Sequence, residues 1–212
     1  MNRSTNDRAP QPECIDHELG DGRVILWPVA FDATTADELF LELERTIDWQ
    51  HETFHLFGTP RKVPRLVAWH GDPGTIYTYS GVTHVPAPWT PVLERVRARV
   101  SELSSAAFNS VLLNRYRNGR DAMGWHSDDE PELGPEPVIG SVSFGATRRF
   151  RLRHRKRRDR TLSFDLPHGS LLIMSGALQT HWMHSLARTS QPVAERINLT
   201  LRRVIPAAGR AG

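Results

Sequence analysis

Residues 196–205 read RINLTLRRVI, and their polar and apolar side chains alternate as on a β-strand. Successive side chains of a strand point to opposite faces, so Ile197, Leu199 and Leu201 form one apolar face. The polar face carries Arg196, Asn198, Thr200 and Arg202. If this face points into a barrel, its two guanidinium groups need anionic partners, because an unpaired buried charge is costly. The alternative is an amphipathic edge strand with solvated arginines.

The same period of two recurs at short intervals from Phe108 onward. The expected strands are 111–116, 138–144, 149–153, 161–166, 170–176 and 196–205, each bounded by Gly, Pro, Asp or Asn. Many short strands at such spacing indicate a sandwich or jelly roll. Amphipathic helices are expected before them, at 34–48 with a threonine cap and at 87–105. Helices first and strands after predict an α+β fold whose helices pack on one sheet.

Length and composition favour a single intracellular domain. We expect one domain at 14–206 between disordered tails at 1–13 and 207–212. No apolar run approaches the ~20 residues that span a membrane, and residues 1–13 lack the apolar segment of a secretory signal. Cys14 is the only cysteine, which excludes an internal disulfide and a cysteine-based zinc or iron–sulfur site. We therefore expect a cytoplasmic monomer with no membrane partner.

Positive charge is concentrated in one segment. Residues 148–160, RRFRLRHRKRRDR, carry a net charge of +8, which leaves −5 for the rest of a chain whose net charge is +3. Phosphate backbones of nucleic acids are the commonest target of such a run, and anionic membranes are the second. On a strand here, Phe150 and Leu152 would face the core. The outward side chains, expected to contact a nucleic-acid backbone, are Arg149, Arg151 and Arg153.

The segment Trp125-His126-Ser127-Asp128 contains two potential metal ligands. On an extended segment, His126 and Asp128 project to the same side and can reach one metal ion. A third ligand is available from His181 or His184; on a strand these two point to opposite sides, so only one would serve. Two histidines and a carboxylate leave three positions open on an octahedral ion, as in non-haem Fe(II) oxygenases. Zinc hydrolases use the same set, and HxD triplets also arise by chance.

Six motifs, taken in order, resemble those of the AlkB family of 2-oxoglutarate-dependent oxygenases, and specifically the branch that includes the eukaryotic double-stranded-DNA repair demethylases. The motifs are Asn114-Arg115-Tyr116, His126-Ser127-Asp128-Asp129-Glu130, Ser141-Val142-Ser143-Phe144-Gly145, His168-Gly169-Ser170-Leu171, His181-Trp182-Met183-His184-Ser185 and Arg196-Ile197-Asn198-Leu199-Thr200-Leu201-Arg202. The resemblance covers about residues 55–204. It implies a double-stranded β-helix (jelly-roll) core at 108–205 and a nucleotide-recognition lid at about 50–85.

The resemblance also implies a reaction and the residues that support it. The implied iron ligands, which are also the catalytic residues, are His126, Asp128 and His184. The implied 2-oxoglutarate contacts are Arg196 and Tyr116 at the distal carboxylate, and Arg202, Asn198 and Asn114 near the carboxylate beside the keto group. The implied reaction is oxidative demethylation of N-alkylated DNA bases, such as 1-methyladenine and 3-methylcytosine. It uses Fe(II), 2-oxoglutarate and O₂ and releases formaldehyde, succinate and CO₂.

Upstream segments resemble the substrate-binding parts of that family. In this likeness Tyr79 stacks on a flipped base opposite His184, and Phe57 is an apolar finger that enters the duplex. Asp129 and Glu130 would favour a cationic base. Ordinary packing is the alternative for the tyrosines and for Phe57. The expected substrate contacts outside the Arg-rich strand are Phe57, Arg65, Trp69, Tyr77, Tyr79, Ser80, Asp129 and Glu130, of which Arg65 belongs either to the phosphate-binding surface or to the lid.

Three functions remain as hypotheses from the sequence. The first is base demethylation on DNA, and the second is the same chemistry on RNA or protein. The core motifs do not separate these two, although the finger at Phe57 favours duplex DNA. The third is a non-catalytic nucleic-acid-binding jelly roll. The complete ligand set and the two arginines of residues 196–202 argue against it, because a pure binding module has no need of them.

Overall fold

The computed structural model describes residues 12–56, 59–75, 77–79 and 82–205, with the side chains of 54–62 and 77–84 outside the description. The helices are α1 (Ala33–Thr46), α2 (Pro91–Ser104) and α3 (Leu178–His181), and a 3-10 turn, η1, spans Pro131–Leu133. The first strands are β1 (Ile15–Glu18), β2 (Arg23–Trp27), β3 (Thr53–Leu56), β4 (Thr59–Lys62), β5 (Leu66–Gly71), β6 (Tyr77–Tyr79) and β7 (Val82–His84). The later strands are β8 (Ser110–Tyr116), β9 (Met123–His126), β10 (Ile139–Gly145), β11 (Arg148–His154), β12 (Thr161–Leu166), β13 (Ser170–Ser175), β14 (Trp182–Leu186) and β15 (Arg196–Arg202).

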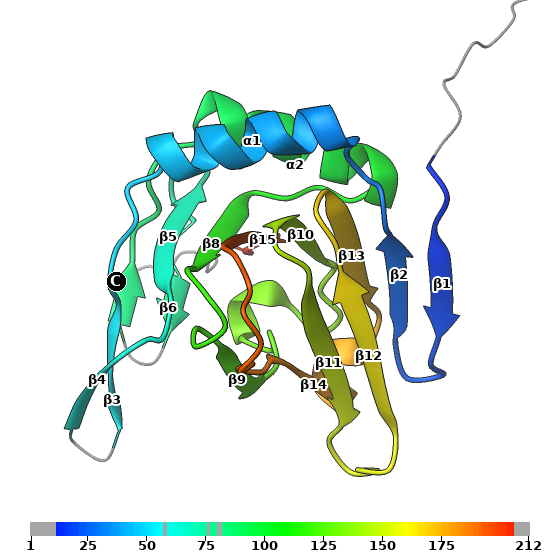
Figure 1. Cartoon of the computed structure of the whole chain (residues 1–212). Helices are drawn as coiled ribbons and strands as arrows, with labels where there is room; N and C mark the ends of the chain where they lie inside the picture. The colour runs from blue at the N-terminus through cyan, green and yellow to red at the C-terminus, as the bar shows by residue number, and fades with distance from the viewer. Residues whose placement is uncertain (1–11, 57–58, 76, 80–81, 206–212) are drawn as a thin grey trace, which may run out of the picture.

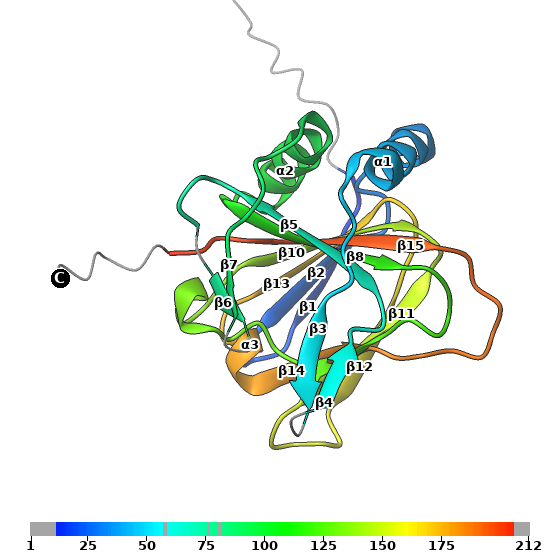
Figure 2. The same cartoon turned by 90° about the vertical axis from the view of Figure 1, so that its left-hand side faces the viewer.

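Two antiparallel sheets enclose the interior of the protein (Figure 1). The larger has the strand order β1-β2-β13-β10-β15-β8-β5, and the smaller has the order β12-β11-β14-β9. The hairpins β3-β4 and β6-β7 form separate two-stranded sheets. Both helices α1 and α2 lie on the outer side of the larger sheet (Figure 2). The predicted jelly roll with helices on one sheet is confirmed, while the lid at 50–85 stays a prediction.

Strand β15 lies in the middle of the larger sheet, between β10 and β8. Its apolar face, Ile197, Leu199 and Leu201, packs in the core between the sheet and the helices. Its polar face, Arg196, Asn198, Thr200 and Arg202, is also buried, with exposed fractions between 2% and 9%. The edge-strand alternative is therefore wrong. The alternation along β15 separates the apolar layer under the helices from a group of buried polar side chains on its other face. A second apolar cluster, which includes Leu172 of the larger sheet and Phe150 and Leu152 of the smaller one, packs between the two sheets.

The two long helices begin where their caps allow. Helix α1 is capped by Asp32, whose Oδ1 accepts a hydrogen bond from the Thr35 amide at 2.9 Å, so the predicted threonine cap is wrong. Helix α2 begins only at Pro91, because proline is suited to the first helical position and Thr90 is extended. Short α3 was not predicted. In the described part of the chain, no helix has the length and apolar character needed to cross a membrane.

Several strands do not show the alternation of polar and apolar residues. Strand β2 has a continuous apolar run, Val24 to Trp27, because its two faces pack in different apolar clusters: Val24 and Leu26 in one, Ile25 and Trp27 in the other. Strand β5 pairs with β8 at the other end of the larger sheet. Strands β9 and β14 are short and contain ligand-type residues in place of a regular apolar face. These strands extend the sheets and build the walls around the interior.

We predict that Gly169→Ala strongly lowers the free energy of unfolding. Gly169 has φ +75°, and a Cβ there would lie 2.6 Å from the Phe31 carbonyl oxygen. Its own carbonyl accepts hydrogen bonds from the amides of Ala30 and Phe31, which tie the start of α1 to the sheet. A left-handed alanine costs about 1–2 kcal/mol and overpacking adds about 1–3 kcal/mol. Urea unfolding is expected to show a loss of about 2–5 kcal/mol.

Gly74→Ala is the matched control. Gly74 has a similar φ of +83°, but nothing lies within 4 Å of the added Cβ. Only the backbone term of about 1–2 kcal/mol is therefore expected. Equal losses in the two variants would contradict the role of the Phe31 contact.

Candidate metal centre

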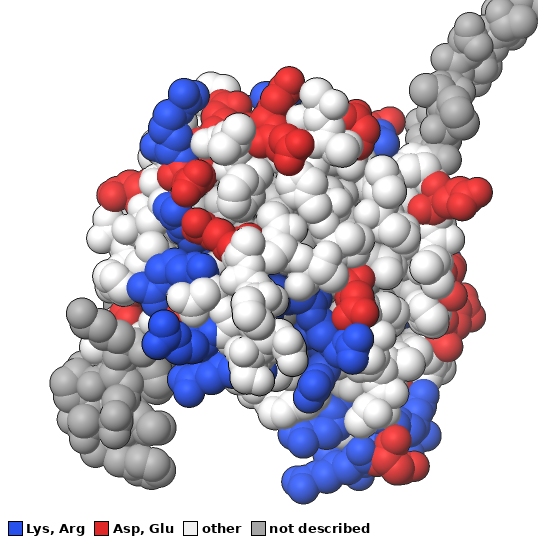
Figure 3. Space-filling view, in the orientation of Figure 1, with Lys and Arg blue, Asp and Glu red and all other residues white. Residues whose placement is uncertain are grey.

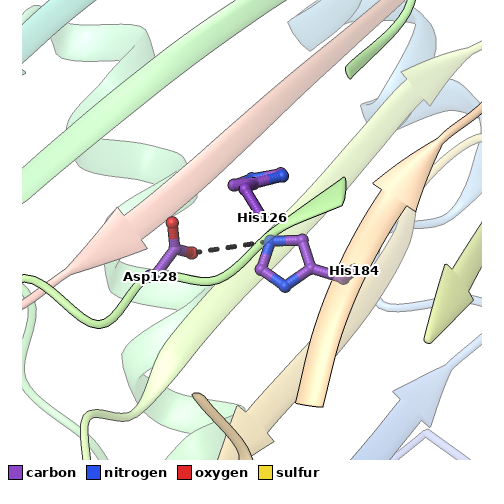
Figure 4. Close-up of side chains that lie close together, drawn as sticks. All are labelled: His126, Asp128 and His184. Atoms are coloured by element: carbon purple, nitrogen blue, oxygen red, sulfur yellow. Dashed lines mark ion pairs between the residues drawn. The ribbon is translucent and has the colours of Figure 1, made fainter. Parts of the chain in front are cut away.

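Three potential metal ligands converge between the sheets (Figure 4). His126 is the last residue of β9, Asp128 follows two residues later, and His184 lies on β14 directly opposite His126 in the strand pairing. The nearest ligand atoms of the three side chains all lie within 4.8 Å of one another. Asp128 and His184 are buried, with exposed fractions of 2% and 4%. Cross-strand pairing thus brings together residues 58 positions apart, in a geometry suited to one metal ion.

The two histidines are in the form that binds metal. The Nδ1 of His126 lies 2.8 Å from the Gly124 carbonyl, which can only accept, so Nδ1 carries the proton and Nε2 keeps its lone pair for the metal. Burial lowers the pKa of His126. Burial, together with the neighbouring His126, lowers the pKa of His184 to about 3. Both imidazoles are therefore neutral at neutral pH, as metal ligation requires.

Asp128 is held as an ionised ligand. Arg202 Nη2 donates to Asp128 Oδ1 at 2.6 Å, whereas the buried Oδ2 has no hydrogen-bond partner among the described residues and lies 3.9 Å from His184 Nε2. Burial, the largest single effect, would raise the pKa of Asp128, but the charge and hydrogen bond of Arg202 together with the neighbouring His184 and His126 hold the pKa below its usual value. One carboxylate oxygen is fixed by Arg202, and the other is directed toward the histidines. This donor set fits a divalent metal with nitrogen and oxygen ligands.

His181 does not belong to this group. It is the last residue of α3, and its ring stacks on His154, with 6.1 Å between centroids and 8° between planes. The prediction that His181 and His184 occupy opposite faces of one strand was therefore wrong, because the strand begins only at Trp182. The geometry selects His184 as the third ligand.

A second polar group lines the interior beside the triad. The pairing of β15 with β8 places Tyr116 opposite Arg196 and Asn114 opposite Asn198. A small cavity is lined by Asn114, Tyr116, Asn198 and Arg202 together with the triad. All five residues expected to contact the cosubstrate thus lie on these two strands, and all but Arg196 line the cavity.

Arg196 is the cation of this group that lacks an anion. It is 2% exposed, its Nη2 donates to Ser143 Oγ at 2.8 Å, and its guanidinium lies over the Tyr116 ring at 5.3 Å. Within the described residues, no carboxylate lies at ion-pair distance from Arg196, and its Nε has no hydrogen-bond partner. Burial lowers its pKa to about 10, so it remains charged at neutral pH. A buried cation of this kind fits an anionic ligand. Arg202 already pairs with Asp128 through Nη2, so its expected contact with a ligand carboxylate stays a prediction.

A larger pocket adjoins the triad and contains several predicted substrate contacts. Its lining includes Arg65, Trp69 and Glu130 together with His126 and Asp128. Glu130 Oε2 is buried and has no hydrogen-bond partner in the described part of the chain. Arg65 is only 5% exposed and donates through Nε to Asn114 Oδ1 at 2.5 Å, so it does not belong to an outer phosphate-binding surface.

The remaining predicted contacts fall into two groups. Phe57 and Ser80 lie outside the described residues, and so do the side chains of Tyr77 and Tyr79. On β11, Phe150 and Leu152 are buried as predicted. The arginines between them differ: Arg149 pairs with Asp165 at 2.9 Å, Arg153 lies over the Trp125 ring at 4.4 Å, and Arg151 is exposed. Arg148, in the same run, is buried.

Two residues that the sequence did not indicate support the loop containing Asp128. Gln179, from α3, accepts a hydrogen bond through Oε1 from the Asp128 amide at 3.0 Å and is 2% exposed. Arg155 donates through Nη2 to Ser127 Oγ and Asp129 Oδ2, on the two sides of Asp128. Asp129 is thus paired with Arg155. No sequence motif marks these contacts, because the two residues of each contact are 26 to 51 positions apart.

Comparison with known proteins agrees with this geometry. A family model described as the 2OG-Fe(II) oxygenase superfamily matches residues 23–202. DNA oxidative demethylase ALKBH2 of Mus musculus is 44% identical over 200 residues, which cover 90% of this chain and 84% of the relative. Alpha-ketoglutarate-dependent dioxygenase alkB homolog 3 of Homo sapiens is 40% identical over 217 residues, covering 94% and 75%. The solved structure of OsALKBH1 has a similar fold, with a TM-score of 0.64 at 17% identity, covering 89% of this chain and 100% of that one.

Asp128→Asn is expected to abolish tight binding of a divalent metal while the protein stays folded. The amide keeps an oxygen for Arg202 but loses the charge that a metal ligand supplies. Mn(II) affinity, measured by calorimetry, should fall by more than the ~10–100-fold typical of a lost outer contact. Unchanged Mn(II) affinity would contradict the ligand assignment.

Gln179→Leu is expected to weaken Mn(II) binding by about 10-fold, because it leaves the buried Asp128 amide without its acceptor. Gln191→Leu, at an exposed loop position, is the matched control and should bind Mn(II) like the wild type. Equal affinities for all three proteins would remove Gln179 from the metal site.

Proposed function

Because the chain belongs to the AlkB family within the 2OG-Fe(II) oxygenase superfamily, we propose that it repairs DNA by oxidative demethylation of alkylated bases. It is a dioxygenase that uses Fe(II) and 2-oxoglutarate. The observation that carries the proposal is 44% identity over 90% of the chain to a protein named DNA oxidative demethylase, together with a complete buried His-Asp-His triad. We propose 1-methyladenine and 3-methylcytosine as substrates.

In the proposed site, His126, Asp128 and His184 hold Fe(II), and Arg202 keeps Asp128 ionised. Bound Fe(II) and 2-oxoglutarate supply oxidation by O₂: 2-oxoglutarate becomes succinate and CO₂, and the N-methyl carbon is hydroxylated and leaves as formaldehyde. Arg196 offers the buried positive charge for the distal carboxylate of 2-oxoglutarate, with Tyr116 beside it. Asn114, Asn198 and Arg202 line the same cavity and are proposed to orient the other carboxylate.

The pocket beside the triad is proposed to receive the flipped base. Glu130 lines this pocket and has one buried carboxylate oxygen, and a negative charge favours a base that methylation has made cationic. Trp69 forms part of the wall, and Arg65 supports Asn114. The lid at 50–85, with Tyr77, Tyr79 and Ser80, and the finger at Phe57 complete the proposal on the strength of the sequence resemblance.

Outside the pocket, the β11–β12 hairpin is proposed to contact the phosphate backbone. Arg151 is exposed on β11, whereas Arg149 and Arg153 have partners at Asp165 and Trp125 that phosphates would have to replace. Asp129 likewise has to leave Arg155 before it can face a base. We propose that the protein acts as a single domain, as a monomer in the cytoplasm and without a membrane partner.

The proposal is tested by anaerobic reconstitution with Fe(II) and 2-oxoglutarate, followed by O₂ and a duplex that contains one 1-methyladenine. Mass spectrometry follows the methyl group, and a second assay follows succinate. We expect loss of the methyl group with a matching amount of succinate. Succinate without repair of any methylated DNA would redirect the proposal to RNA or protein, and an absence of both products would contradict it.

Arg196→Met is expected to raise the KM for 2-oxoglutarate by about 30-fold or more, because it removes the buried cation proposed for the distal carboxylate. Arg151→Met, on the exposed face of β11, is the matched control and should leave this KM unchanged. Succinate release at several 2-oxoglutarate concentrations measures both. An unchanged KM in Arg196→Met would place the cosubstrate elsewhere.

A further inference from the structure

Two loops lie against each other beside the pocket. One follows β8 and spans residues 117–122, and the other follows β14 and spans residues 187–191. The Thr189 amide donates to the Gly119 carbonyl at 2.9 Å. The approach is so close that a Cβ on Gly119 would lie 2.5 Å from the Thr189 carbonyl oxygen. The two loops therefore form one continuous surface.

Arg148 fixes both loops from beneath. It is 4% exposed and donates to the carbonyl oxygens of Asn118 at 3.3 Å, Asp121 at 3.1 Å and Ala187 at 2.7 Å. One buried guanidinium thus ties together backbone from both loops. Side chains carried by these loops are held on a fixed base.

The groove between the loops presents positive charge. Its lining includes Arg120 and Arg188, which are exposed and have no ion pair within the described part of the chain. Asp121 does not oppose them, because it is buried and takes three hydrogen bonds from Arg117, at 2.8 to 3.0 Å. Lys and Arg side chains gather over the lower half of the face seen in Figure 3.

The groove is continuous with two neighbouring features. His51 lines both the groove and the larger pocket beside the triad. Arg188 also lines a second groove, together with Arg149 and Arg151 of β11. A path of cations therefore leads from the mouth of the pocket, across the 187–191 loop, to the basic strand.

We propose that Arg120 and Arg188 bind backbone phosphates of the nucleic-acid strand that carries the target base, next to the flipped nucleotide. The proposal rests on the proposed function and adds a strand-binding site to it. Two cations that have no ion pair among the described residues, on loops fixed by Arg148, suit a ligand with one negative charge per nucleotide. Such contacts position the strand without reading its sequence.

The test measures binding of a fluorescein-labelled single-stranded oligonucleotide with one 1-methyladenine, by anisotropy, at several KCl concentrations. Mn(II) replaces Fe(II), with 2-oxoglutarate present. The variants are Arg120→Gln, Arg188→Gln and their combination. Arg45→Gln is the matched control, because Arg45 is an exposed arginine on α1, in the helix layer on the other side of the larger sheet.

We expect the combined variant to bind about 10-fold more weakly near 0.1 M salt. The slope of log affinity against log salt should become shallower by about 0.7 for each arginine removed. Circular dichroism should show the wild-type fold, since both side chains are exposed.

Failure of the groove and failure of the proposed function give different results. If the wild type repairs the base and the Arg120 and Arg188 variants have the same salt slope as Arg45→Gln, the groove is not a phosphate-binding site. The proposed demethylase activity would be unaffected. The opposite result is a wild-type protein that does not remove the methyl group but whose variants have a shallower slope of log affinity against log salt. It would overturn the proposed demethylase activity and support the groove as a nucleic-acid site. No binding of the single strand by a wild type that repairs the duplex would overturn the groove proposal alone.

Discussion

The buried ion pair between Arg202 and Asp128 joins the two sheets at the point where the chemistry takes place. Arg202 ends β15 in the larger sheet, and Asp128 follows β9 of the smaller one, yet their charged atoms lie 2.6 Å apart. Removal of one partner from such a pair leaves a buried charge without compensation, a loss of about 3–5 kcal/mol. The pair also fixes one oxygen of the carboxylate and so decides which oxygen faces the metal. Stability and metal geometry depend on the same contact.

The local alternation of side chains was sufficient to predict the layers of the fold. The faces of β15 and β11 could be assigned from period two alone, because each strand has one apolar face in a core cluster and one polar face directed away from it. The same reasoning failed for His181, since a short helix turn precedes β14 and the residue does not lie on the strand. It also failed for β2, whose sequence is apolar throughout.

The sequence likewise predicts some residues of the candidate site and not others. The two ligands close in sequence, His126 and Asp128, follow from their spacing, whereas His184 required either the family resemblance or the pairing of β14 with β9. Gln179 and Arg155 could not be found, because a glutamine or an arginine has no spacing rule and their contacts depend on where α3 and the hairpin fold back. The internal neutralisation of the basic run was also beyond the sequence: Asp21, far upstream, takes hydrogen bonds from Arg157 and Trp182 at 2.6 and 2.7 Å.

His184 pairs directly with His126 across β14 and β9, so the geometry of the metal centre depends on the register of these two strands. A slip of one residue would turn one imidazole to the opposite face of the small sheet and separate it from the carboxylate. A chain that has closed its barrel in the wrong alignment therefore cannot assemble the three ligands. Metal binding therefore depends on correct strand register, because only correctly aligned molecules acquire the ion and the capacity to oxidise a substrate.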